Sequence, residues 1–186
     1  MTTTTTEFTE LTGTYTLDVA HSRVGFVARH AMVTKVRGSF DEFEGTATLD
    51  GSNPENSSVS VTIQVASVDT RNDQRDGHLR TNDFLDVEKF PTITFSSTAI
   101  KHLGGNDFEV TGNLTVKGVT KQVVLPVEYQ GAATDPYGNK RIGFEGSTTI
   151  NRSDYGVNFN AALETGGVLV SEKITLEFEI SAIKNA

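Results

Sequence analysis

The amino-acid sequence predicts an all-β protein: an eight-stranded antiparallel up-and-down barrel with a short helix and a long loop or helical turn near the barrel mouth. Three observations lead to this fold class. Apolar and polar residues alternate with a period of two along most of the chain, as they do in half-buried strands. Short turn-like segments join these stretches, and only two longer stretches break the alternation. The length of 186 residues suits one domain with a single core.

Five stretches alternate strictly between apolar and polar side chains. Such stretches are typical of strands that have one face in a core and the other in water. In chain order they are residues 58–65, 108–116, 123–129, 142–150 and 174–182.

Three further strands, and a short one that precedes them, are less regular. In one of them the alternation slips between Phe40 and Phe43, which are three positions apart instead of two. An extra residue of this kind is typical of a β-bulge, so we expect a bulge there. These less regular strands lie at residues 14–18, 22–30, 36–49 and 92–102.

Tight turns join several of these strands. Residues 104–107 are Gly-Gly-Asn-Asp, Lys117 and Gly118 give a second turn signal, and residues 135–139 carry a proline followed by a glycine. Sequential antiparallel strands joined in this way form a meander. A meander of eight strands closes into an up-and-down barrel, because closure leaves no exposed sheet edge.

Two stretches do not alternate. Residues 70–85 are expected to hold a short helix, because Thr70 and Asp73 have the spacing of a capping box. Residues 153–170 form the longest irregular connection, with a turn of helix expected near residues 159–163. Long connections in a compact domain are often functional, so we place the mouth of the barrel at these two stretches.

Composition and charge exclude several classes of protein. The net charge of −8 repels phosphate backbones and the basic residues are scattered along the sequence, so we expect no nucleic-acid partner. The sequence has no cysteine, which excludes disulfides, thiolate zinc sites, iron–sulfur clusters and cysteine nucleophiles. No apolar run approaches the roughly 20 residues of a membrane helix, so we expect no transmembrane segment.

The first dozen residues carry little structural signal. Residues 2–6 are all threonine, and no basic residues followed by an apolar stretch mark a secretory signal. We therefore expect a disordered tail at residues 1–12, a single barrel domain at residues 13–186, and a cytoplasmic protein.

No catalytic, metal-binding or cofactor-binding motif is recognisable, so we expect a binding protein without catalytic residues, metal or cofactor. The four histidines do not have the i, i+2 or i, i+4 spacing of metal ligands, although ligands can also converge from distant strands. Four aspartates surround the expected helix, where we expect them to stabilise the helix start and stay solvated. His78 with Asp76 or Asp154 is the one pairing that suggests acid–base chemistry.

The expected strand faces carry many phenylalanines, and the two irregular stretches add more large apolar side chains. An eight-stranded barrel can be filled by its own side chains or can hold one small ligand. The residues alone leave open whether the interior is packed or hollow.

Several segments together resemble the YceI-like family, lipocalin-like barrels that bind polyisoprenoids and similar lipids. The most telling is residues 78–95, which read HLRTNDFLDVEKFPTITF. Residues 15–26 are similar to the first strands of the family, residues 112–121 to its hairpin motif, and residues 151–156 to the segment after its seventh strand. The resemblance runs in order through nearly all of residues 14–184. Many members carry a secretory signal, which this sequence does not show.

The resemblance implies a carrier or storage protein, homodimeric in some members, whose apolar pore holds an amphipathic lipid such as a polyisoprenoid or an isoprenoid quinone. The helix expected at residues 73–83 and the loop at 153–170 would form the lid. We place four polar side chains there as head-group contacts: Arg75, His78, Arg152 and Asn158. The apolar residues expected to bind the ligand are Phe26, Phe40, Phe43, Phe84, Leu85, Phe95, Phe144, Phe159 and Leu163.

Three alternatives stay open. An enzyme or stress-response factor acting on such a lipid would bring two or more titratable groups together inside the pore. A packed barrel serving protein contacts would fill its pore with aromatic side chains. Arg152 and Asp154 would, in a purely structural role, hold the long loop in place.

Overall fold

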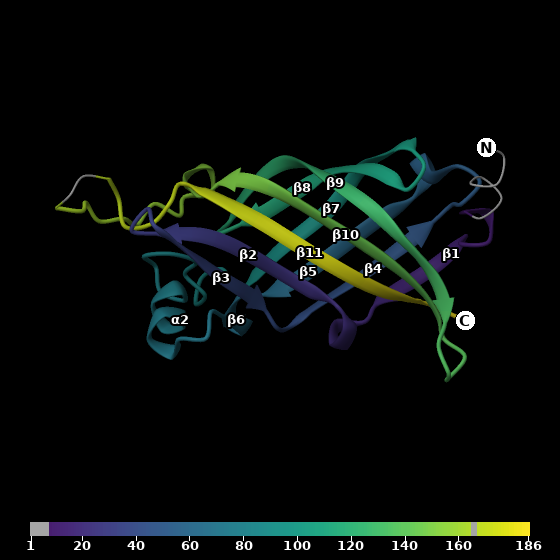
Figure 1. Ribbon diagram of the computed structural model, residues 1–186, viewed down its shortest axis with the longest axis horizontal. Coiled ribbons are helices and arrows are strands. Elements are labelled where there is room, and N and C mark those ends of the chain that lie inside the picture. Colours follow the sequence, from purple (N-terminus) through teal and green to yellow (C-terminus); the bar gives the residue numbers. More distant parts are fainter. Residues whose placement is uncertain (1–7, 165–166) are drawn as a thin grey trace.

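A computed structural model describes residues 8–164 and 167–186, and in it one antiparallel sheet forms a closed barrel (Figure 1). The strands are β1 (Gly13–Leu17), β2 (Arg23–His30), β3 (Thr34–Phe40), β4 (Phe43–Leu49), β5 (Ser58–Gln64), β6 (Val68–Asp69), β7 (Thr92–Gly104), β8 (Asp107–Val116), β9 (Val119–Thr134), β10 (Lys140–Asn151) and β11 (Lys173–Lys184). The helical segments are η1 (Val19–His21), η2 (Pro54–Asn56), η3 (Val65–Ser67), α2 (Asp73–Leu79) and η4 (Arg152–Tyr155).

The strands occupy eight positions around the barrel, which confirms the predicted fold class. β11 pairs with β1 through its last residues and with β2 through earlier residues, so β1 and β2 are two halves of one barrel strand. β3 and β4 share the next position, since β3 pairs with β2 and β4 pairs with β1. β5 and β6 share the third position in the same way. The pairing of β1 with β11 closes the barrel.

The slip in alternation between Phe40 and Phe43 is a break between two strands, so the predicted bulge is wrong. The pairing of β3 ends at Phe40, and the pairing of β4 begins at Phe43. Between them, the N–H of Asp41 donates to the carbonyl of Ser67 in η3, and the carbonyl of Glu42 accepts from the N–H of Gln64. Both phenylalanines are buried in one apolar core, so the break lets two half-strands each present a large side chain inward.

The short helix is present, but it is shorter than predicted and capped by another residue. α2 spans seven residues, and its N-cap is Asn72, whose side chain accepts a hydrogen bond from the N–H of Arg75. Thr70 is not the cap, because its N–H and its hydroxyl both donate to the buried carboxylate of Asp76. None of the helices in the part of the chain that the structure describes is long and apolar enough to cross a membrane.

The long connection after β10 differs from the prediction in where it is helical. Its helical turn is η4, at the start of the connection, and residues 159–163 are not helical. The loop instead folds back on itself, with Ala162 bridged to Val168 and Val170 bridged to His30 of β2. We call the end of the barrel that carries α2 and this loop the helix end (Figure 1).

Residues 8–12, which the sequence assigns to a disordered tail, pack against the barrel; the rest of that tail, residues 1–7, lies outside the described residues. Phe8 is only 4% exposed, and its ring packs against Phe108 and Tyr129. The backbone N–H of Gly51 donates to the hydroxyl of Thr12, which fixes the segment to the β4–β5 connection. These residues cap the barrel opposite the helix end, and we call this the N-terminal end.

A small charge cluster ties the N-terminal part of the barrel to the β9–β10 turn. Arg141 donates through Nη1 to the carboxylate of Asp18 and through Nε to the carboxylate of Asp135, at 2.5 and 2.8 Å. Asp135 also accepts the backbone N–H groups of Tyr137 and Asn139 in the turn. The hydrogen bond from Arg141, followed by the turn amides, holds the pKa of Asp135 far below its usual value, and Arg141 also lowers the pKa of Asp18.

We predict that this cluster makes the barrel sensitive to acid. Both carboxyl groups have folded-state pKa values below their unfolded values, so the stability they contribute is present above about pH 5 and is lost as the pH falls through the folded values. The melting temperature of Asp135→Asn, measured by circular dichroism, should therefore fall less between about pH 5 and pH 2 than that of the wild type. Glu88→Gln, an exposed control, should follow the wild type. Equal acid sensitivity of wild type and Asp135→Asn would contradict the assignment.

Candidate functional site

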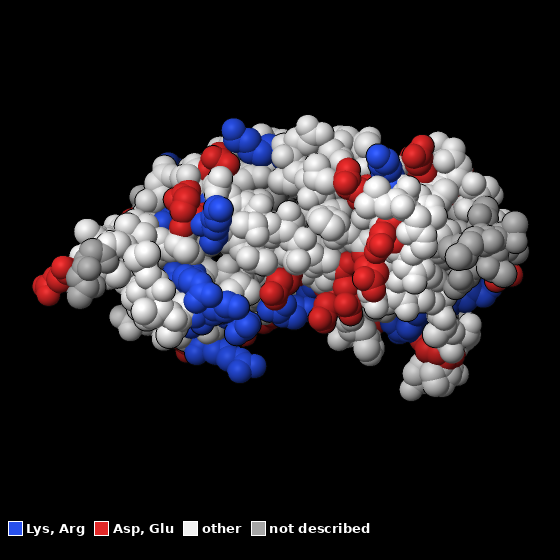
Figure 2. Space-filling model, turned by 45° about the horizontal axis from the view of Figure 1, so that its top comes forward, with Lys and Arg blue, Asp and Glu red and all other residues white. Residues whose placement is uncertain are grey.

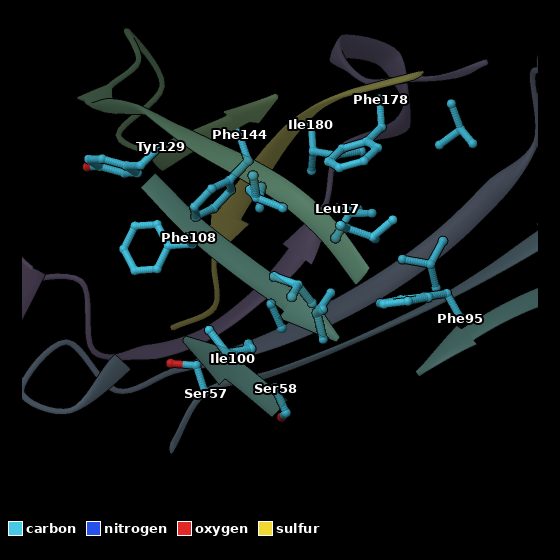
Figure 3. Close-up of a pocket in the computed structure, with 18 of the residues that line it drawn as sticks. Leu17, Ser57, Ser58, Phe95, Ile100, Phe108, Tyr129, Phe144, Phe178 and Ile180 are labelled. Carbon is cyan, nitrogen blue, oxygen red and sulfur yellow. The ribbon is translucent and has the colours of Figure 1, made fainter. Parts of the chain in front are cut away.

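An apolar cavity of about 290 Å³ lies inside the barrel (Figure 3). Inward-facing side chains of the barrel strands line it, among them Leu17 of β1, Ile100 of β7 and Ile180 of β11. For comparison, a buried apolar cavity of roughly 150 Å³ can hold one benzene molecule. The barrel is therefore hollow, and the alternative of a pore filled by its own aromatic side chains does not hold.

Two phenylalanines lie against glycines on the inner wall. A Cβ placed on Gly112 would come within 2.6 Å of the ring of Phe95, and a Cβ on Gly146 would come within 2.4 Å of the ring of Phe178. Each ring thus occupies the space that a side chain in place of the glycine on the adjacent strand would take. Glycine at these two positions lets the rings lie on the wall, which keeps the lumen open.

Three of the polar residues that line the cavity gather at its N-terminal end. We call Asp50, Ser57 and Ser58, all from the β4–β5 connection and the start of β5, the polar rim (Figure 3 shows both serines). Phe8 lies at the same end and also lines the cavity. Its backbone crosses Gly51 so closely that a Cβ on this glycine would collide with the Phe8 carbonyl. Two short segments therefore close this end of the barrel.

Few ionisable groups lie along the cavity. Among the described lining residues, Asp50, Glu177 and Tyr129 have such side chains. The carboxylate of Asp50 accepts hydrogen bonds from its own loop, and that from the N–H of Asn53 contributes most to lowering the pKa of Asp50. Glu177 is paired with Arg23 at 3.2 Å. The described residues hold no cluster of three or more histidines and carboxylates that could bind a metal ion.

The helix end is closed by aromatic side chains. The ring of His78 meets the rings of Phe84 and Phe159 edge-on, each at a centroid distance of 5.0 Å. Nε2 of His78 lies 2.8 Å from the carboxylate of Asp83. The pairing of His78 with Asp76 or Asp154 is therefore wrong, and the pair that forms is exposed and lies away from the cavity.

Two of the residues predicted to contact the lipid head group, both arginines, donate their hydrogen bonds to other groups of the protein. Arg152 is 5% exposed, and its guanidinium donates to the carbonyls of Val157, Val170 and Ser171, which holds the long loop to η4. Burial lowers the pKa of Arg152. Arg75 donates to the hydroxyl and the carbonyl of Thr70. The purely structural interpretation of Arg152 thus fits its contacts, and a contact with lipid stays a prediction for both arginines.

The structure separates the predicted site residues into three groups. Three of them line the cavity: Phe40, Phe95 and Phe144. Five others belong to or pack against the same apolar core but lie outside the cavity lining: Phe26, Phe43, Phe84, Leu85 and Phe159. The rest lie at the helix end, away from the lining: Arg75, His78, Arg152, Asn158 and Leu163.

Sequence reasoning missed most of the cavity wall and the whole polar rim. Leu125, Ile100 and Ile180 line the cavity, and their place in strictly alternating or nearly alternating strands was the signal that could have found them. Phe8 and Ser57 follow no periodicity, and Ser58 opens an alternating stretch as a polar residue expected on the wet face, so no comparable signal exists for them.

Comparison with known sequences agrees with this geometry. The profile of the YceI-like domain matches residues 15–182, which is nearly the whole barrel. The chain belongs to the YceI-like family. Among relatives of this YceI-like protein, a UPF0312 protein of Ectopseudomonas mendocina is 42% identical over 153 residues, covering 81% of this chain and 80% of the relative. A UPF0312 protein of Staphylococcus aureus is 39% identical over 169 residues, covering 90% and 95%.

Solved structures share the YceI-like barrel. BcnA of Burkholderia cenocepacia matches with a TM-score of 0.79 at 28% identity, covering 89% of this chain and 98% of that one. The YCEI protein of Campylobacter jejuni matches with a TM-score of 0.74 at 31% identity, covering 85% and 90%. A polyisoprenoid binding domain from Saccharophagus degradans, only 17% identical, shares the fold with a TM-score of 0.69 over 92% and 98%.

Proposed function

We propose that this YceI-like barrel binds the hydrocarbon chain of an amphipathic lipid, with an isoprenoid chain as the favoured ligand. One observation carries the proposal: the barrel encloses an apolar cavity of about 290 Å³ whose wall comes from all around the sheet. A hollow apolar core has no structural advantage, because each void forfeits dispersion contacts between its lining atoms. A ligand that fills the cavity would restore those contacts. The polyisoprenoid binding domain with the same fold supports this ligand class.

The size of the cavity sets how much chain it can take. It is about twice the roughly 150 Å³ that holds a benzene molecule, so it has room for about twelve carbon atoms. Burying ten methylene equivalents contributes about 8 kcal/mol before the costs of ordering the ligand. A longer chain would extend beyond the cavity at one end.

We place the lipid head group at the polar rim, in place of the helix end that the sequence indicated. Ser57 accepts a hydrogen bond from the N–H of Asp50, and a hydroxyl that accepts one hydrogen bond can still donate another. Serine hydroxyls are suitable donors to the carbonyl oxygens of a quinone. An isoprenoid quinone is therefore our candidate ligand, and a carrier or storage role follows from binding without chemistry. Homodimerisation is part of the proposal and is tested by light scattering.

The test of this proposal is lipid analysis of the purified protein. Solvent extraction and native mass spectrometry should find a co-purifying lipid, or else one-to-one uptake of added geranylgeraniol and menaquinone by the delipidated protein. A hydrophilic compound of similar mass is the control and should not be retained. The proposal is overturned if no lipid co-purifies and neither added compound is retained.

A further inference from the structure

The β2–β3 hairpin ends in a turn that its sequence does not favour. The N–H of Val33 donates to the carbonyl of His30, and the two central residues, Ala31 and Met32, have φ values of 50° and 66°. Left-handed backbone at both central positions is the geometry of a type I′ turn, for which Asn-Gly is preferred because other side chains are strained there. The chain thus keeps a strained turn that places a methionine at the tip of the hairpin. Strain of this kind is often retained where it serves function.

The tip of this hairpin exposes apolar side chains. Met32 is 59% exposed and Val33 is 75% exposed. Beside them, Val168 of the long loop is 40% exposed. The loop is held to the hairpin there, because the N–H of Ala31 donates to the carbonyl of Leu169, the residue after Val168. Hairpin and loop therefore form one apolar tip at the helix end, made of Met32, Val33 and Val168.

Basic side chains lie directly behind the apolar tip. Arg29 of β2 stands opposite Lys35 of β3, and Arg37 follows two residues later on the same face, while Lys173 opens the adjacent strand β11. These residues are scattered along the sequence, and the hairpin register brings them together. We call these four residues the basic stripe. Like charges directly opposite in a sheet repel each other, so the stripe does not arise from sheet stability.

Acidic side chains form a separate row farther along the barrel. Asp107 of β8, Glu128 of β9, Glu145 of β10 and Glu179 of β11 are successive cross-strand neighbours, and all four are exposed. Glu179 lies six positions after Lys173 on β11, which is about 20 Å along a strand. Figure 2 shows a group of basic side chains toward the helix end of the molecule and acidic ones nearer its middle, with further acidic side chains at the tip and upper edge of the helix end. The basic stripe and the acidic row therefore lie at different positions along the barrel axis, while the helix end also carries exposed acidic residues, among them Asp73, Asp83 and Glu164.

We propose that the helix end docks on the surface of an anionic lipid bilayer, with the apolar tip among the head groups and the basic stripe against their negative charge. Exposed apolar side chains flanked by lysine and arginine are the combination that holds proteins at such surfaces. The acidic row is repelled by the same surface, so the barrel stands on its helix end and does not lie on its side. The proposal does not require the cavity to be occupied.

Vesicle sedimentation with matched variants tests the docking. The wild type should bind vesicles of equal parts phosphatidylglycerol and phosphatidylcholine, less tightly as salt is added, and should not bind vesicles of phosphatidylcholine alone. Each basic residue at an anionic surface is worth about fivefold, so the triple variant Arg29→Gln, Lys35→Gln, Arg37→Gln should bind roughly a hundredfold more weakly. The control Lys101→Gln, Lys121→Gln, Lys140→Gln makes the same charge change on exposed residues of β7, β9 and β10 and should bind nearly as the wild type.

A second variant separates binding from stability. The double substitution Ala31→Asn, Met32→Gly relieves the strained turn and removes the methionine, so it should raise the melting temperature by a few degrees while weakening vesicle binding severalfold. Three outcomes would overturn the proposal: no binding of the wild type to anionic vesicles, equal losses in the test and control triple variants, or tighter binding of the stripe to duplex DNA than to vesicles. Lipid uptake into the cavity is measured separately, so its failure would not be mistaken for failure of docking.

Discussion

Replacing Ala47 with tryptophan is expected to weaken lipid binding about a hundredfold while the barrel stays folded. Ala47 is a small residue of β4 that lines the cavity, and an indole there would take up a large part of the 290 Å³ void. Excluding three or four methylene equivalents of ligand costs about 3 kcal/mol, so the dissociation constant should rise about a hundredfold. The free energy of unfolding should change little, because the indole gains contacts with the cavity wall. Titration with geranylgeraniol and urea unfolding measure the two quantities.

The matched control is Thr48→Trp. Thr48 is the next residue of the same strand, points to the outer face and is exposed. This variant should bind lipid as the wild type does. Unchanged uptake by Ala47→Trp, or an equal loss in both variants, would mean that the lipid does not occupy the cavity.

Arg152→Met is expected to lower the free energy of unfolding by about 3 kcal/mol. The substitution removes donors to the carbonyls of Val157, Val170 and Ser171. The carbonyl of Val170 keeps a second donor in the side-chain amide of Asn160, so the acceptors that lose their arginine donor without this replacement are those of Val157 and Ser171. Each such acceptor costs about 1–3 kcal/mol, and relaxation of the loop offsets part of the sum. Urea unfolding followed by circular dichroism gives the value.

Two companion variants make the Arg152 result specific. Arg75→Met removes a half-buried arginine whose side chain donates to the hydroxyl and the carbonyl of Thr70, so it should cost less than about 1 kcal/mol. Arg152→Lys keeps the positive charge but lacks the several N–H donors of the planar guanidinium. It should therefore recover only part of the free energy of unfolding that Arg152→Met loses. A wild-type free energy of unfolding in Arg152→Met would show that the guanidinium does not hold the loop.

The sequence was informative about strands because period-two alternation follows directly from a sheet with one wet and one dry face. The alternation through Val59, Val61 and Ile63 predicts side chains that do line the cavity. The same signal could not show that Phe40 and Phe43 belong to separate strands. Both a bulge and a strand break shift the phase by one residue, and only the partners across the sheet distinguish them.

The site was less predictable, because alternation identifies the inner face but not the end at which a cavity opens. The length of the two irregular connections was the reason to expect the mouth of the cavity at the helix end. These connections instead pack against each other there, where the rings of Phe84 and Phe159 contact that of His78. Phe8 stands in a polar stretch, and its burial depends on Gly51, which is distant in the sequence. The basic stripe likewise exists only once the register places Arg29 opposite Lys35.

The most direct test of a lipid chain inside the barrel is a set of nuclear Overhauser effects between bound geranylgeraniol and the protein's methyl groups. The methyl groups of Ile100, Leu125 and Ile180 line the cavity, whereas Val124, the neighbour of Leu125, is 45% exposed. Cross-peaks from the isoprenoid methyls to the three cavity residues, and none to Val124, are the predicted result. Cross-peaks confined to Val124 and other surface methyls would contradict the account.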